Sequence, residues 1–73
     1  MDALHRTLTK NIRSLMAKRR LSVNRLADFS GVGRGRMSET LAGKSSPTVR
    51  TLGRIAEALD VSVRDLFEPH DGR

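Results

Sequence analysis

The segment Gly31–Thr40 reads GVGRGRMSET, with three glycines and two arginines in its first six residues. It has three interpretations: a loop that wraps a nucleotide phosphate, a disordered basic tail, or a turn that leads into an exposed helix. A dinucleotide-binding glycine loop follows a strand of a buried parallel sheet, but a helical pattern precedes this segment. The later GKSS, at 43–46, imitates the end of a P-loop, yet position 38, where that motif needs glycine, is serine. We therefore do not favour either nucleotide-binding interpretation.

The residues around this segment have the spacing of a helix-turn-helix. Two short helices that cross steeply need a small contact residue, a turn residue with positive φ, a residue that plugs the turn, and two inward faces on the second helix. In chain order, the residues that meet these needs are Ala27, Gly31, Val32, Met37 and Thr40. The segment therefore predicts a turn between a helix at about 23–29 and a helix at about 34–42.

Apolar residues at helical spacing predict three further helices. The first follows an N-cap at Asp2 and ends near Arg20, the fourth follows Thr48, and a short fifth runs from Ser62 until Pro69 stops it. Ser22 and Gly33 are the expected N-caps of the second and third helices, and Gly31 and Gly43 are expected to end them. The apolar faces are expected to be Leu4, Leu8, Ile12, Leu15 and Met16 in the first helix and Val49, Leu52, Ile55, Ala56 and Leu59 in the fourth. No strand pattern is present, so the sequence predicts an all-α fold.

The length and composition limit the classes of function. We expect 73 residues to form one domain, spanning 1–73, with residues 69–73 frayed. So few helices leave little room for an enclosed catalytic cleft, and we do not expect an enzyme. The chain has no cysteine and its two histidines lie near opposite ends, so we expect neither a metal site nor a cofactor. With no signal-peptide pattern and no apolar stretch that could span a bilayer, we expect a soluble, cytoplasmic protein.

The charge points to a nucleic-acid partner. Fourteen Lys and Arg residues against eight Asp and Glu residues give a net charge of +6, which predicts a polyanionic partner. The aromatic residues are Phe29 and Phe67 alone, so the stacking platforms of single-strand binders are missing. Double-stranded DNA is therefore the expected partner. A membrane surface is not favoured, because the cations are spread over several helices rather than along one amphipathic face.

The stretch LSVNRLADFSGVGRGRMSETLAGKSSPTVRTLGRIAEALDVSVRDLF, at 21–67, resembles the lambda-repressor-like, Cro/C1-type (XRE) DNA-binding family. The resemblance extends from Ile12 to Phe67, and its motifs are specific jointly rather than singly. It implies a five-helix domain of prokaryotic or phage origin, with the helix-turn-helix at helices two and three and the third helix in the major groove of DNA. It also implies a transcriptional regulator, such as a repressor.

Three positions depart from the family pattern. Many members have glutamine at the second position of helix two, where this chain has Val23, which offers a phosphate only its backbone N–H. Many members also pair an arginine of helix one with a glutamate of helix three, where this chain has Met16 and Leu41. Replacing a buried ion pair by apolar residues avoids the desolvation of two charges. We therefore expect Met16 and Leu41 to touch in the core.

The resemblance implies that the exposed side of the third helix reads base edges, through Arg34, Gly35, Ser38 and Glu39. Arg34 suits the O6 and N7 atoms of guanine, although a phosphate contact or a solvated side chain is the alternative. Glu39 either accepts from a cytosine amine or forms a salt bridge that orients Arg34 or Arg36. Gly35 either allows close approach to the groove or is merely tolerated.

The resemblance also implies contacts to the sugar-phosphate backbone, from the start of helix two, the third helix and the loop after it. The residues expected to make these contacts are Ser22, Val23, Arg36, Lys44, Ser45, Ser46, Thr48 and Arg50.

Family members generally bind DNA as two-fold dimers, so we expect a homodimer on a pseudo-palindromic operator. The expected interface is Val61, Val63 and Phe67. The alternative is that Val63, Leu66 and Phe67 merely cap the core of a monomer. No effector domain is expected to follow, so the protein would act by occupying its operator, either excluding RNA polymerase or contacting it. The competing class is an antitoxin or protein-interaction module that uses the same fold.

Overall fold

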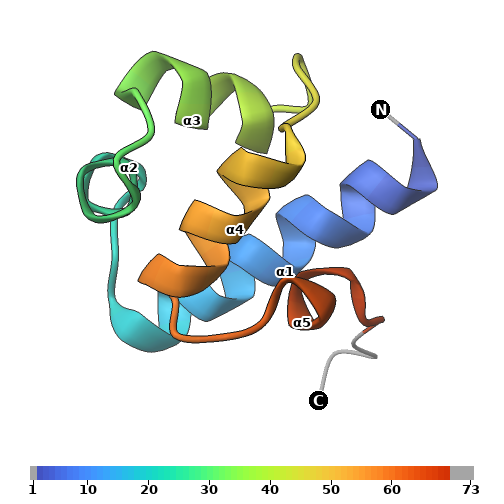
Figure 1. Ribbon diagram of the computed structural model, residues 1–73. Helices are drawn as coiled ribbons and strands as arrows, with labels where there is room; N and C mark the ends of the chain where they lie inside the picture. The colour runs from blue at the N-terminus through green and yellow to red at the C-terminus, as the bar shows by residue number, and fades with distance from the viewer. Residues whose placement is uncertain (1, 70–73) are drawn as a thin grey trace.

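The computed structural model describes residues 2–69, which form five α-helices and no strand (Figure 1). The helices are α1 (Ala3–Arg19), α2 (Val23–Ser30), α3 (Arg34–Leu41), α4 (Val49–Ala58) and α5 (Val63–Phe67). The predicted all-α, five-helix fold is therefore confirmed. Most of the tail that was expected to fray, residues 70–73, lies outside the described residues.

Side-chain caps start four of the five helices. Asp2, Ser22, Thr48 and Ser62 each accept a hydrogen bond from the backbone N–H three residues further on, which satisfies a donor that the helix leaves free. Asp2, Ser22 and Thr48 had been predicted as N-caps, and Ser62 only as the start of the fifth helix. Gly33 precedes α3 without a side-chain cap, also as predicted.

The helices pack around one apolar cluster. α1 packs on α5, while α2 packs on both α3 and α4, and α4 also contacts α5. Each helix contributes at least one of the largest fully buried apolar side chains, which are those of Ile12, Leu26, Met37, Ile55, Leu59 and Leu66. In Figure 1, α3 lies along the top of the view and α5 near the bottom, with α4 between them. This arrangement leaves one side of α3 uncovered by other helices.

Two expectations about the core need correction. Leu4 and Val49, assigned to the apolar faces of their helices, have 61% and 82% of their surface exposed. Both lie in the first turn of a helix, before its first buried residue, at an end that extends past the core cluster. Met16 and Leu41 are both buried in the core cluster, as expected, and their direct contact remains a prediction.

Asn11 is a buried polar residue that the sequence did not reveal. Only 2% of its surface is exposed, and its amide nitrogen donates to the carbonyl oxygens of Leu66 (2.9 Å) and Glu68 (2.7 Å). These oxygens lie at the end of α5, where the helix has no N–H groups left for them. Asn11 therefore ties the middle of α1 to the end of α5.

Candidate nucleic-acid interface

The turn between α2 and α3 fixes which side of α3 faces outward. Gly31 ends α2 with a left-handed φ of 73°, and the N–H of Val32 donates to the carbonyl of Ala27 at 3.1 Å. The Val32 side chain is 9% exposed and plugs the turn, as the spacing predicted. Met37 is also fully buried, so the opposite side of α3 is turned to solvent.

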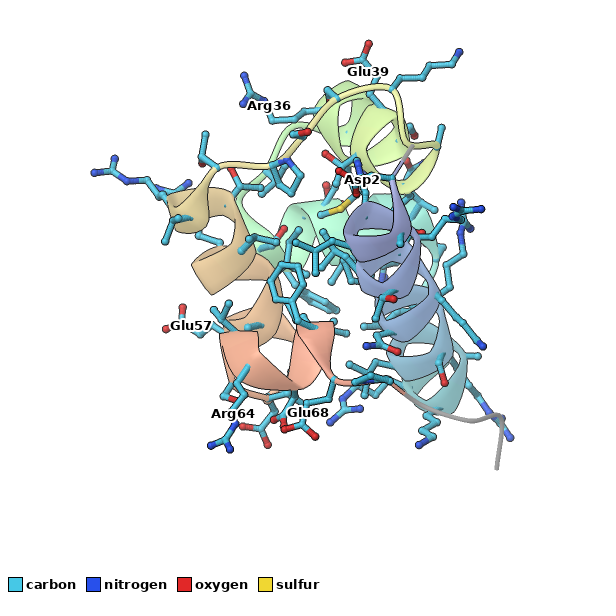
Figure 2. All side chains as sticks on the ribbon, turned by 90° about the vertical axis from the view of Figure 1, so that its right-hand side faces the viewer. Asp2, Arg36, Glu39, Glu57, Arg64 and Glu68 are labelled. Carbon is cyan, nitrogen blue, oxygen red and sulfur yellow. The ribbon has the colours of Figure 1, made fainter. Side chains whose placement is uncertain are left out.

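Thr40 belongs to the inward side as well. Its side chain had been expected to pack rather than to read bases, and only 1% of its surface is exposed. The residues on the outward side are Arg34, Gly35, Arg36, Ser38 and Glu39, all of which are exposed. In Figure 2, Arg36 and Glu39 project from the top of the molecule, at the end opposite Arg64 and Glu68. The end of the molecule that carries α3 thus presents a polar, largely cationic face.

Arg34 forms an ion pair across the turn with Asp28, near the end of α2. Its Nε donates to Asp28 Oδ1 at 3.1 Å and its Nη2 donates to Oδ2 at 2.7 Å. The hydrogen bond from Arg34 lowers the pKa of the Asp28 carboxyl below its usual value. Desolvation opposes this shift, and the charges of Arg34 and Arg25 add to it. The same contact raises the pKa of Arg34.

Glu39 takes no part in this contact. Within residues 2–69, the ion pairs shorter than 4 Å are Arg34–Asp28 and Arg64–Glu68. The salt-bridge interpretation of Glu39 is therefore not what the structure displays, and its carboxylate stays exposed. The residue that orients Arg34 is Asp28, which sequence reasoning missed because the two residues come together only when the turn forms.

The residues predicted to contact phosphates occupy two regions. Arg36 borders a hollow of about 170 Å³ with Ser45 and Ser46, and a second hollow of about 260 Å³ with Arg50. The structure thus brings Arg36 close to the loop after α3 and to the start of α4. Lys44 is exposed on the same loop. Ser22 and Val23, at the start of α2, border neither hollow.

Two of these residues have a capping role in the chain itself. The hydroxyl oxygens of Ser22 and Thr48 accept from the backbone N–H groups of Arg25 and Thr51, so each helps to begin a helix. The Val23 side chain packs against the core cluster, which leaves its backbone as the part available to a ligand.

Arg54 is a further cation that sequence reasoning did not assign to this face. It lines the larger hollow with Arg36 and Arg50, and its Nη1 donates to the carbonyl of Gly31 at 3.4 Å. Its position one helical turn after Arg50 is the sequence signal that could have assigned both residues to the same side of α4.

Side chains of α1 hold the other end of α3. The Nε2 of His5 lies 3.0 Å from the carbonyl oxygen of Thr40, and Nη2 of Arg13 donates to the carbonyl of Leu41 at 3.5 Å. These carbonyls are among the last four of the helix, which have no partner within it. Contacts from α1 therefore supplement the glycine turn in fixing the direction of α3.

The residues predicted for a dimer interface lie on and just before α5, and one of them, Phe67, borders a hollow with Ser46 of the loop after α3. Val61, Val63 and Phe67 are partly buried and pack against the core cluster. Phe67 also borders a shallow apolar hollow of about 160 Å³ with Leu4 and Pro47. Part of each of the three side chains is exposed to solvent.

Residues 2–69 contain no cluster of three histidine or acidic side chains that is arranged to hold a metal ion. Across the same residues, no helix has the length and apolar character that crossing a membrane requires.

Comparisons with known proteins agree with this geometry. The model of the Cro/C1-type HTH DNA-binding domain matches residues 11–72. The HTH-type transcriptional regulator SutR of Escherichia coli (strain K12) is 35% identical over 69 residues, which make up 94% of this chain and 39% of that protein. This chain thus spans about two fifths of the length of that relative. The crystal structure of the restriction-modification controller protein C.AhdI from Aeromonas hydrophila matches with a TM-score of 0.79 and 28% identity, over 84% of this chain and 92% of that one.

Proposed function

The chain belongs to the Cro/C1-type helix-turn-helix DNA-binding family, and we propose that it is a sequence-specific transcriptional regulator that acts by occupying an operator in double-stranded DNA. The observation that carries the proposal is the outward side of α3, where Arg34 and Arg36 are exposed and Arg36 borders a hollow with Arg50. An α-helix fits the major groove of B-form DNA, and arginine recognises guanine there.

In this proposal, the outward side of α3 reads base edges and its surroundings hold the backbone. The base-reading residues are Arg34, Gly35, Ser38 and Glu39. Because Glu39 is exposed and free of an ion pair with Arg34, it is available to accept from a cytosine amine. The phosphate-binding residues are Ser22, Val23, Arg36, Lys44, Ser45, Ser46, Thr48 and Arg50.

The proposed regulator binds as a two-fold dimer. One domain of this kind reads only a few base pairs, and two copies on a pseudo-palindromic site double that number. The interface we propose is formed by Val61, Val63 and Phe67, on and just before α5. Contact with RNA polymerase, or its exclusion, would then follow from where the operator lies.

Selection of bound duplexes from a random pool tests the proposal. We expect an enriched half-site, and an affinity that falls with salt with a log-log slope of about −0.9 for each neutralised phosphate. Arg34→Ala is expected to cost about 1–3 kcal/mol on the selected site and to relax the preference at one base pair. Lys44→Ala is expected to weaken binding to all sequences alike, because a phosphate contact carries no sequence information. A pool without enrichment would contradict the proposal.

A further inference from the structure

Arg34 and Asp28 form a side-on, two-point contact that is held on the outward side of the helix-turn-helix. The contact uses Nε and Nη2 of the guanidinium and both oxygens of the carboxylate, at 3.1 and 2.7 Å. The two side chains remain 59% and 49% exposed. Exposed ion pairs contribute little to folding. The main effect of this pair is therefore on the orientation of the arginine.

The contact leaves one edge of the guanidinium free. An arginine has five N–H groups, and Asp28 takes one from Nε and one from Nη2. The two N–H groups of Nη1 and the second one of Nη2 remain, and they share the end of the side chain. Guanine offers O6 and N7 side by side in the major groove, which suits two N–H groups from one such edge. Arg34 can thus bind Asp28 and a guanine at the same time.

The charge of Asp28 also affects what Arg34 binds. The carboxylate offsets the positive charge of Arg34, which reduces the attraction of this pair for a phosphate. A base edge is a neutral acceptor, and its hydrogen bonds depend more on direction than on net charge. Asp28 therefore favours a base contact over the backbone contact that is the alternative for Arg34.

We propose that Asp28 is a positioning residue that sets the specificity of Arg34, by holding its guanidinium ready for a guanine edge. This inference rests on the proposed function. A side chain that is already ordered loses less conformational freedom on binding. Removal of Asp28 is therefore expected to weaken the preference for guanine without weakening non-specific binding.

The test compares wild type, Asp28→Ala, Arg34→Ala and the double variant on three duplexes. These are the selected operator, the operator with the base pair read by Arg34 exchanged for A·T, and an unrelated duplex of the same length. For Asp28→Ala we expect the preference for operator over exchanged duplex to fall roughly two- to tenfold. Its affinity for the unrelated duplex should be equal or higher, because a negative charge has been removed from this face. In the double variant, the preference for operator over exchanged duplex should fall no further than in Arg34→Ala, because Asp28 acts on this preference only through Arg34.

Two further variants separate positioning from general charge. Asp28→Asn keeps the size of the side chain but loses the charge, and we expect an effect in the same direction as that of Asp28→Ala. Glu57→Gln removes an exposed carboxylate of α4 that lies well below Arg36 and Glu39 in Figure 2, and it should leave the preference at the exchanged base pair unchanged. Thermal melting of each variant confirms that it is folded.

The outcomes are distinct. If Asp28→Ala leaves the preference at the exchanged pair unchanged, the inference is wrong while the proposed function stands. In that case, equal tightening on all three duplexes would indicate that Arg34 contacts a phosphate, and unchanged affinities would indicate that Asp28 is only a surface partner. If wild type shows no preference for its selected duplex, the proposed function itself fails, and this inference fails with it.

Discussion

At the scale of single residues, Gly35 poses a clear question. It lies inside α3, where glycine is less favourable than alanine by about 1 kcal/mol. A Cβ at this position would meet no atom within 4 Å, so nothing in the folded chain requires glycine. We expect Gly35→Ala to raise the free energy of unfolding by about 0.5–1 kcal/mol in a denaturant titration. We also expect it to weaken binding to the selected operator, because the added methyl group lies on the side that we propose to approach the groove.

Gly53 provides a matched control for Gly35. It also lies inside a helix, α4, and a Cβ there would likewise meet nothing within 4 Å. Gly53→Ala should therefore give the same gain in stability with no change in operator affinity. Equal operator binding by both variants would mean that Gly35 is merely tolerated.

Thr40 carries a buried hydroxyl that has no hydrogen-bond partner among the described residues. Burying an unpaired hydroxyl costs free energy, so Thr40→Val, which keeps the shape, should raise the free energy of unfolding by about 1 kcal/mol. Thr51→Val is the control, because the Thr51 hydroxyl accepts a hydrogen bond from that of Thr48 at 3.0 Å. Thermal unfolding measures both variants, and the control should lose stability. A loss in Thr40→Val as well would show that a water molecule satisfies this hydroxyl in solution.

The ion pair between Arg34 and Asp28 predicts a pH effect. The pKa of the Asp28 carboxyl is lowered from its usual 3.8, chiefly by the hydrogen bond from Arg34. A lowered folded-state pKa means that the contribution of the pair is present above the usual value and is lost as the pH falls through the lowered one. A carbon-detected NMR titration should therefore show Asp28 titrating below its usual range in wild type. In Arg34→Ala it should move up towards that range, and an unchanged titration would mean that the pair does not form in solution.

At the scale of helices, Asn11 joins α1 to α5 through two hydrogen bonds. We expect Asn11→Leu to lower the free energy of unfolding by about 1–3 kcal/mol, because it leaves the carbonyls of Leu66 and Glu68 unpaired. Asn24→Leu, at an exposed position of α2, is the control and should change stability little. Chemical denaturation measures both. If Asn11→Leu were as stable as the control, the two hydrogen bonds would add nothing to the docking of α5.

The boundaries of the helices were predictable because they depend on local chemistry. A hydroxyl or carboxylate that caps a helix acts on a neighbour three residues away, so Ser22 and Thr48 could be identified from sequence. The contacts of Asn11 span 55 and 57 residues and could not. Val49 fits the periodic pattern of α4, yet it is exposed because periodicity does not tell where the core ends.

At the scale of the whole molecule, the outward direction of α3 could be predicted and the details of its surface could not. Gly31, Val32 and Met37 determine which side of α3 is buried, and they do so by residue type and spacing alone. The partners of Arg34 and Arg36 depend on how far exposed side chains reach across a turn or to another helix. Asp28 entered the candidate site for that reason only after the fold was known, whereas the spacing of Arg54 from Arg50 could have assigned Arg54 to this face.

Dimerisation is the prediction that concerns the whole assembly. Because Val61, Val63 and Phe67 already pack against the core of one copy, their exposed parts must suffice for the interface that we propose. Two copies on a palindromic site should bind with half-sites about 34 Å apart, on one side of the duplex. Inserting about 5 base pairs, half a helical turn, between the half-sites would place the copies on opposite sides of the duplex and should abolish cooperative binding. Inserting about 10 base pairs returns the two copies to the same side of the duplex but leaves their half-sites one turn further apart, so cooperative binding should recover only in part.

Sedimentation on the palindromic duplex measures the stoichiometry, and titration of the three spacings measures the cooperativity. We expect two copies on the original site at micromolar protein concentration. If protein alone and protein with duplex both sediment with one copy, or if all three spacings bind with equal affinity, each domain acts alone. The partly exposed apolar residues around α5 would then serve only to close the core.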